Sequence, residues 1–186
     1  MRGVIFNSFL EYLENKQDYS FVDELIEEAA LINDGSFADA GLYPDEELMR
    51  LMELASKKLE CKVGCCWEEF GEWLFATLFS KFNTLYSGDT YRQSMIHNAF
   101  DFIVMLNTIH YKEVVKLYPD SLFPHFDIIR RTDDELQICY RSKRNLHHLA
   151  KGMLMGCGKY FNESLHIQMH PPKSDSAVLF TITKAA

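Results

Sequence analysis

The spacing of apolar residues changes at Pro124, and this change constrains the fold more than any other feature. Ahead of Pro124, apolar residues recur every three or four positions over several long segments, which is typical of amphipathic helices. Beyond it, apolar and polar residues alternate as they do in half-buried strands. The alternating segments are residues 126–131, 135–140, 165–169 and 177–183. A helix is predicted over 142–160, so the sequence predicts an α+β fold in which helices precede two antiparallel hairpins that flank one helix.

The part of the chain before Pro124 divides into helices at turn signals. Four are predicted in its first half, over residues 2–16, 21–32, 44–59 and 66–82. The fourth is hydrophobic nearly all round, so it belongs in an interior or against a large apolar ligand. We expect an N-terminal helical subdomain of about residues 1–60 packed on an α/β subdomain of about residues 61–186, with one cleft between them. Apolar residues make up 47% of the 186 positions and aromatic residues 13%, which is enough to line such a cleft.

The charge of the chain excludes two classes of partner. Its formal net charge is −8 and its isoelectric point is near 5.3, whereas nucleic acids and anionic membranes both require a basic surface. No stretch reaches the length of a transmembrane helix. Polar residues Asn7, Ser8 and Glu11 interrupt the N-terminus before a signal-peptide core can form. We therefore expect a cytoplasmic protein that binds neither nucleic acid nor membrane.

Five cysteines, an odd number, fit a reducing compartment better than a framework of disulfides. Cys61, Cys65 and Cys66 suggest a metal site, but no second pair follows at zinc-finger distance. An enzyme built on these thiols, or on His147 and His148, would lack the rest of a nucleophile, base and orienting group. We therefore expect no structural zinc at this site and no catalytic activity. The role of the three neighbouring cysteines stays open.

His110 lies in a long apolar segment, residues 102–118, that is predicted to be helical. The apolar residues up to Ile109 keep helical spacing, and those from Val114 onward keep the same spacing only if one residue is counted as extra. An extra residue in a helix is usually accommodated as a π-bulge, and such bulges are frequent at functional sites. A single histidine on an apolar helix face is more often a hydrogen-bonded core residue than a ligand, so other segments have to decide between the two.

A second motif follows the predicted strand 135–140, with Tyr140, Ser142 and Arg144 at alternate positions. Alternate side chains of an extended segment share one side, so the two hydroxyl groups should point the same way. Ser142 is predicted to cap the helix that follows, which would place Arg144 in its first turn. Hydroxyl groups, a guanidinium and free helix amides together form a pocket for a carboxylate or phosphate. The alternative is an ordinary helix cap with an arginine on the surface.

Taken together with His110, this motif resembles that of the haem-nitric-oxide/oxygen-binding (H-NOX) domain, the sensor module of bacterial gas sensors and of soluble guanylate cyclase. In that family a Tyr-x-Ser-x-Arg motif binds the haem propionates, and it stands here at residues 140–144. The family's proximal histidine lies on a helix that ends in Leu-Tyr-Pro, which matches residues 117–119. The opening Met-x-Gly-x-Ile-Phe-Asn matches residues 1–7. The resemblance therefore spans essentially the whole chain.

The resemblance implies that haem b is buried between the two subdomains, held without thioether bonds because the chain lacks a Cys-x-x-Cys-His run. The family's usual spacing counted back from Pro124 reaches Tyr111, whereas the apolar spacing counted forward from Phe102 reaches His110. Neutral imidazole is a good ligand of ferrous iron, while tyrosinate suits ferric iron. We therefore expect His110 to be the axial ligand, with the extra residue in a bulge just after it. Tyr111 is the alternative ligand.

The resemblance also implies how the porphyrin and its gas ligand are surrounded. Ile5 and Pro124 match positions that press on the porphyrin in this family and make it non-planar. Family members that hold oxygen carry a distal tyrosine at the position of Leu149, and the other distal positions match Phe9 and Leu74. Bound oxygen needs a hydrogen-bond donor much more than nitric oxide or carbon monoxide does. We therefore expect the ligands to be nitric oxide and carbon monoxide.

Two histidines add alternatives to this interpretation. His148 stands beside the distal position and is the first candidate for a hydrogen-bond donor there. Some relatives also carry a zinc site near the C-terminus, at which His148 and His170 would supply two ligands. The two cysteines that should follow His170 are missing, so we expect no zinc.

The resemblance implies a signalling role rather than catalysis. Nitric oxide weakens the iron–histidine bond opposite to it, so its binding to a five-coordinate ferrous haem would free His110 and let the subdomains rotate against each other. The chain ends soon after the last predicted strand, so we expect a partner in trans, either a histidine kinase or a diguanylate cyclase. The alternative function is a haem-independent interaction module whose thiols sense oxidation.

Overall fold

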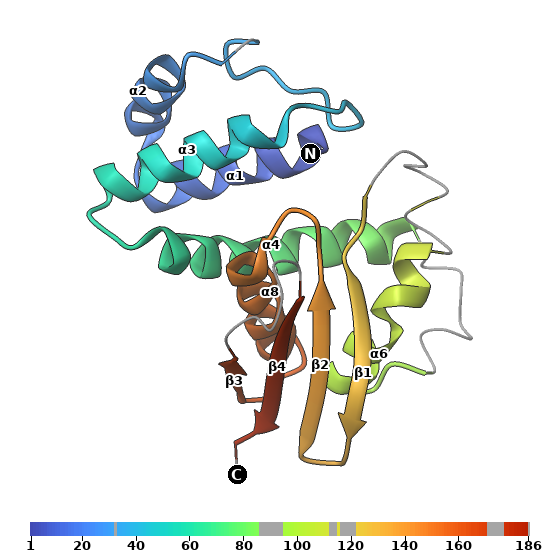
Figure 1. The fold of residues 1–186 in the computed structure, drawn as a ribbon. Helices are drawn as coiled ribbons and strands as arrows, with labels where there is room; N and C mark the ends of the chain where they lie inside the picture. The colour runs from blue at the N-terminus through green and yellow to red at the C-terminus, as the bar shows by residue number, and fades with distance from the viewer. Residues whose placement is uncertain (32, 86–94, 112–114, 116–121, 171–176, 186) are drawn as a thin grey trace.

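The computed structural model describes residues 1–31, 33–85, 95–111, 115, 122–170 and 177–185 (Figure 1). Within these ranges the chain forms six helices and one four-stranded sheet, which confirms the α+β prediction. The helices are α1 (Gly3–Lys16), α2 (Tyr19–Ala29), α3 (Asp45–Lys58), α4 (Val63–Leu85), α6 (Ala99–Ile109) and α8 (His147–Tyr160). The strands are β1 (His125–Arg131), β2 (Glu135–Arg141), β3 (Leu165–Met169) and β4 (Ala177–Lys184). None of the helices in the described ranges combines the length and apolar character needed to cross a membrane.

Local signals in the sequence account for where several helices begin. Asp18 caps α2 by accepting a hydrogen bond from the backbone amide of Phe21 (2.9 Å). Asn98 caps α6 through the amide of Asp101, also at 2.9 Å. α3 follows Pro44 and carries three acidic residues in its first turn, where they interact favourably with the helix dipole. The first four helices accordingly lie within a few residues of their predicted ranges.

The sheet is antiparallel throughout, with the strand order β1-β2-β4-β3. Helices α6 and α8 lie on the same side of it (Figure 1), and their apolar side chains share one cluster with those of the strands. On β2, the inward-facing residues Leu136, Ile138 and Tyr140 are buried, while the residues between them are partly exposed. Both predicted hairpins are therefore present, although the connection between β3 and β4 lies outside the described residues.

Buried apolar side chains form two clusters, and α4 contributes to both. The helical cluster joins α1, α2 and α3 to the first half of α4 through Trp67, Phe70 and Leu74. The sheet cluster joins the strands, α6 and α8 to the second half through Phe75 and Phe79. This double role explains why the sequence of α4 is hydrophobic nearly all round. The predicted subdomain boundary near residue 60 remains a proposal, and it falls in the short connection between α3 and α4.

Helices α4 and α8 approach each other closely because glycines lie at their crossing. A Cβ atom added at Gly152 would lie 2.0 Å from the carbonyl oxygen of Glu68, and one added at Gly71 would lie 2.4 Å from that of Leu149. Both obstacles are backbone atoms, which cannot move aside as the end of a long side chain can. A larger residue at either position would therefore force the two helices apart.

Gly152→Ala should lower the free energy of unfolding by about 1–3 kcal/mol, the usual cost of overpacking, even though alanine favours helix formation. Denaturant unfolding of the purified protein measures this change. Lys159→Ala on the same helix is the control, because Lys159 is 70% exposed and its ion pair with Glu72 is worth at most about 1 kcal/mol. Equal losses in the two variants would contradict the close approach at Gly152.

Two of the cysteines depart from expectation. Cys61, just ahead of α4, and Cys66, in its first turns, form a disulfide bond, so the expectation of unpaired thiols is wrong for this pair. Cys65, Cys139 and Cys157 are free. The turn between α3 and α4 brings the pair together, and residue spacing along the sequence does not reveal such a turn.

Candidate functional site

His110 lies at the C-terminal end of α6, where residues 110 and 111 form a π-helical turn. This confirms the bulge that the extra residue in the apolar spacing predicts. Asn107, one turn earlier, fixes this end of α6 to the start of β1. Its amide nitrogen donates to the carbonyl oxygen of Phe126 (2.6 Å), and its side-chain oxygen accepts from the amide of Phe126 (3.0 Å). Sequence reasoning missed Asn107, although a polar residue in so apolar a helix was a usable signal.

The imidazole of His110 is buried in an aromatic environment. Its ring stacks on Phe123 with centroids 5.2 Å apart and lies 6.3 Å from the ring of Phe126. Burial lowers its pKa to about 4, an effect that the Pro124 backbone opposes. Nδ1 is nevertheless buried without a hydrogen bond of normal geometry to any described residue. His110 is therefore neutral at pH 7 and has a ring nitrogen free to bind a ligand, whereas the neighbouring Tyr111 is 71% exposed.

The residues of the Tyr-x-Ser-x-Arg motif lie together at the end of β2, as their alternate spacing predicts. Burial raises the pKa of Tyr140, while a hydrogen bond with the side chain of Ser142 and the charge of Arg144 oppose the shift. The hydroxyl oxygen of Ser142 also accepts a hydrogen bond from the backbone amide of Arg144 (3.2 Å). The two hydroxyl groups therefore lie together, and Arg144 is near enough for its charge to act on Tyr140.

The local structure around this motif corrects two predictions. The helix expected from Ser142 begins only at His147, because Asn145 adopts a left-handed conformation (φ 54°) that ends the preceding turn. Ser142 therefore closes a turn instead of capping α8, and Arg144 does not lie in a first helical turn. The expected contribution of free helix amides to an anion pocket is wrong. The alternative of a surface arginine is also wrong, since the side chain of Arg144 is only 18% exposed.

Arg144 is held by two partners from distant parts of the chain. Its Nε donates to Oδ2 of Asp45 (2.6 Å), and its Nη1 donates to the carbonyl oxygen of Leu122 (2.6 Å). Asp45 also accepts from the N-terminal amine of Met1 (2.5 Å). Burial alone would raise the pKa of Asp45, but these two cationic partners lower it below its ordinary value. Asp45 thus connects the start of α3 to the motif, a contact that sequence reasoning missed because the two residues are far apart in the chain.

A cavity of about 200 Å³ lies beside this motif. Its lining combines two apolar residues that precede β1 with hydroxyl and cationic groups at and just after the end of β2: Leu122, Phe123, Arg141, Ser142, Lys143 and Arg144. Phe123 is the residue on which the His110 ring stacks. The cavity therefore adjoins both predicted motifs and suits an anionic group.

The expected distal residues come from three helices and share one apolar environment. Phe9 of α1, Leu74 of α4 and Leu149 of α8 are all buried in the helical cluster, and Ile5 packs against that cluster. None of these four side chains can donate a hydrogen bond. All four side chains therefore belong to or pack against one apolar cluster, and their roles around a haem stay a prediction.

His148 and His170 both have partners within the described residues. Nδ1 of His148 lies 2.7 Å from Oε1 of Glu68, whose other oxygen accepts from Lys151 (2.7 Å). Nε2 of His170 lies 2.9 Å from the hydroxyl of Thr181. Among the residues that the structure describes, no group of three or more His, Cys, Asp or Glu side chains could hold a metal ion. The Leu-Tyr-Pro run at 117–119 lies outside the described residues.

Comparison with known proteins identifies the family. A family model described as "Haem-NO-binding" matches residues 2–169. The chain belongs to this family. Its structure is similar to that of the unliganded Fe(II) H-NOX protein from K. algicida (27% identity, TM-score 0.83), with 100% of this chain and 97% of that chain covered. It is also similar to the H-NOX protein from S. oneidensis in the Fe(II)NO state (21% identity, TM-score 0.87), with both chains covered completely. No match was found among curated proteins.

Membership of the H-NOX family gives the site a coarse function, that of a haem-based gas sensor. The observed residues fit a haem. A neutral, buried imidazole with an unpartnered nitrogen suits axial ligation of iron. The hydroxyl and guanidinium groups of the Tyr-x-Ser-x-Arg motif suit the two carboxylates of the haem edge. The buried apolar residues of this H-NOX domain suit the porphyrin ring.

Proposed function

We propose that this H-NOX domain senses nitric oxide at a five-coordinate ferrous haem b and regulates a signalling protein in trans. The observation that carries the proposal is the state of His110, which is buried and neutral and has an unpartnered ring nitrogen. Its ring stacks on Phe123, which lines the cationic cavity. When bound, the haem supplies the iron to which a diatomic gas binds. The rest of the function depends on what the side chains of this chain do around it.

Each group of residues has a separate proposed role. His110 is the axial ligand, and the exposure of Tyr111 supports this choice over the alternative. Tyr140, Ser142 and Arg144 hold the propionates by charge-assisted hydrogen bonds. Two further residues, Ile5 and Pro124, are proposed to press on the porphyrin.

Gas selectivity is proposed to follow from the apolar distal residues Phe9, Leu74 and Leu149. Because none of them donates a hydrogen bond, nitric oxide and carbon monoxide should bind well, while oxygen should not be retained. His148 remains a candidate donor, but its Nδ1 is already in contact with Oε1 of Glu68.

The proposed output is rotation of the helical subdomain against the α/β subdomain. The π-helical turn at residues 110 and 111 supports a role for this end of α6, since such turns accompany functional sites. The Asp45–Arg144 ion pair connects the two proposed subdomains next to the cavity, so a change there can reach both. We propose a histidine kinase or a diguanylate cyclase as the partner, in the cytoplasm.

An absorption spectrum of the purified protein tests this function against its alternative. A Soret band after supplementation with haem, and a shift of that band when nitric oxide is added to the reduced protein, are the expected results. Failure to acquire a Soret band would contradict the proposed function and favour a haem-independent module.

Arg144→Ala should make haem loss roughly ten- to a hundred-fold faster, because a charge-assisted hydrogen bond contributes about 1.5–3 kcal/mol. Transfer of haem to an excess of an apoprotein acceptor measures the rate. Arg130→Ala is the control, since it removes the same charge at a side chain that is 63% exposed. An unchanged rate in Arg144→Ala would show that the propionates are held elsewhere.

A further inference from the structure

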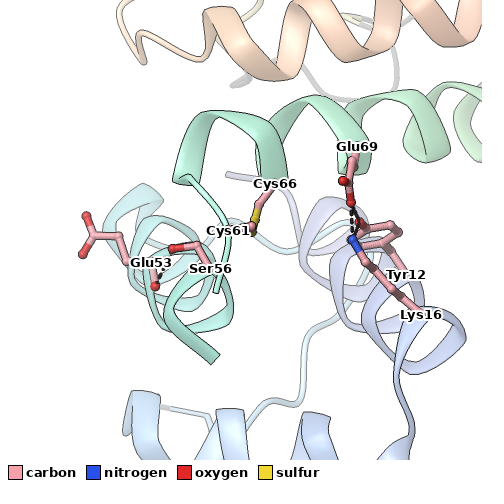
Figure 2. The surroundings of a disulfide bond; sticks show 7 residues. All are labelled: Tyr12, Lys16, Glu53, Ser56, Cys61, Cys66 and Glu69. Carbon is pink, nitrogen blue, oxygen red and sulfur yellow. Dashed lines mark hydrogen bonds and ion pairs between the residues drawn. A yellow bond between two sulfur atoms is a disulfide. The ribbon is translucent and has the colours of Figure 1, made fainter. Parts of the chain in front are cut away.

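The disulfide between Cys61 and Cys66 lies at the connection between α3 and α4, where the chain passes from the helical subdomain to the rest (Figure 2). The helices end and begin only a few residues apart, at Lys58 and Val63. The chain passes from the helical subdomain to the rest only at this connection. The bond ties the segment that follows α3 to the first turns of α4, so it limits how far these two helix ends can turn against each other.

The backbone holds Cys61 in position for this bond. The amide of Cys61 donates to the carbonyl oxygen of Ser56 (3.0 Å), and that of Glu60 donates to Lys57 (3.2 Å). Glu60 takes the left-handed conformation (φ 51°) that usually ends a helix in this pattern. The Cα atoms of Cys61 and Cys66 are 6.7 Å apart, within the range that a disulfide spans. The bond is therefore compatible with the backbone that the two helix ends define.

The three neighbouring cysteines differ in exposure, which gives them different roles. Cys66 is only 3% exposed and belongs to the helical cluster, while Cys61 packs against the edge of that cluster and is partly exposed. Cys65 is exposed and free. Cys61 is thus the more accessible residue of the bonded pair, and the buried Cys66 is placed to complete a reaction that begins there.

The polar contacts between α1 and the first half of α4 are weak. Figure 2 shows the side chains of Tyr12 and Lys16 of α1 directed towards Glu69, about one turn beyond Cys66 on α4. Glu69 is 55% exposed, and exposed ion pairs hold a fixed geometry poorly. The disulfide is therefore a constraint on the start of α4 in addition to apolar packing and to the contacts of Glu68 with His148 and Lys151.

We propose that Cys61 and Cys66 are a reversible thiol–disulfide site that small-molecule disulfides oxidise, and that its state is a second input to the gas sensor. In a reducing compartment a bonded pair is usually transient or redox-sensing. The regulatory part rests on the proposed function, because the movement that the bond restrains is the proposed subdomain rotation.

The reaction is a pair of thiol–disulfide exchanges. The Cys61 thiolate attacks one sulfur of the small disulfide, forms a mixed disulfide and releases one small thiolate. The Cys66 thiolate then attacks the Cys61 sulfur and releases the second small thiolate. The two protein thiols lose two electrons in total, the small disulfide is reduced to two thiols, and the two protons given up by the cysteines end on those thiols. An excess of small thiol reverses both steps.

The test is thiol trapping on the full-length protein in buffers of reduced and oxidised glutathione, followed by alkylation and mass spectrometry. In oxidising buffer, peptide mapping of the wild-type protein should find Cys61 and Cys66 joined to each other, whereas the exposed Cys65 can carry only a single glutathione, which its added mass identifies. Cys65→Ser, the matched control, should keep this pair, while Cys61→Ser and Cys66→Ser should both lose it. Five alkylated thiols at every glutathione ratio, a bond that excess thiol cannot reduce in the folded protein, or pairing of Cys61 with Cys65 would each overturn the proposal.

Two further measurements test how the disulfide affects the connection between α3 and α4. Amide hydrogen exchange over residues 59–66 should be roughly tenfold faster in reduced than in oxidised wild-type protein. Loss of haem should be several-fold faster in the reduced state, and this difference should vanish in Cys61→Ser, whose altered residue lies at the edge of the core. Equal rates of haem loss in the reduced and oxidised proteins would overturn the proposal that the disulfide is a second input to the gas sensor. Trapping does not require haem, so a protein that pairs its thiols but binds no haem would contradict only the proposed function.

Discussion

Replacing His110 with glycine should abolish haem retention in the purified protein, and added imidazole should restore it. The ring of His110 is buried and neutral, with pKa lowered to about 4, so the wild-type residue offers iron an imidazole without a competing proton at pH 7. Glycine leaves a space next to Phe123 in which free imidazole can bind. Rescue by imidazole also shows that the variant is folded.

Tyr111→Phe is the matched control for this substitution. The side chain of Tyr111 is 71% exposed, so loss of its hydroxyl group should leave the ferrous absorption spectrum nearly unchanged. Haem retained in His110→Gly without imidazole, together with a changed spectrum in Tyr111→Phe, would reverse the assignment of the axial ligand.

The reduced, haem-loaded protein should bind nitric oxide and carbon monoxide, and in air it should oxidise without forming a stable oxygen complex. The distal residues Phe9, Leu74 and Leu149 offer no donor to an oxygen that carries partial negative charge. Absorption spectra recorded after each gas is added to the reduced protein measure this selectivity. The expected effect is large, because the oxygen complex either persists or does not form in a stable state.

A long-lived oxygen complex in the unmodified protein would contradict this prediction and would show that a donor exists. His148→Ala would then identify the donor, because His148 is the first candidate near the distal residues and its Nδ1 is paired with Glu68 in this structure. Leu149→Tyr tests the converse and should lengthen the lifetime of an oxygen complex if its hydroxyl group reaches the ligand.

The parts of the fold that depend on local pattern could be predicted from the sequence. The strand pattern predicted both hairpins, and it is clearest on β2, where Leu136 and Ile138 are buried and the residues between them are partly exposed. The extra residue after Ile109 predicted a π-helical turn, and residues 110 and 111 form one. Alternate spacing likewise predicted that Tyr140 and Ser142 would meet.

The parts that depend on distant contacts could not be predicted. The late start of α8 follows from the left-handed conformation of Asn145, which competes with the helix signal at Ser142. Asp45 looked like an acidic residue that stabilises a helix dipole, yet it also binds Arg144, 99 positions away. The Cys61–Cys66 bond depends on the turn that ends α3, and cysteine spacing carries no information about that turn.

The resonance Raman spectrum of the reduced, haem-loaded protein tests the central assignment most directly, because it detects the bond between iron and its axial ligand. We predict an iron–imidazole stretching band in wild-type protein and in Tyr111→Phe. The band should disappear when nitric oxide is added, as expected if the gas releases His110. A reduced wild-type protein without an iron–imidazole band, or a band that persists in His110→Gly without added imidazole, would contradict the account.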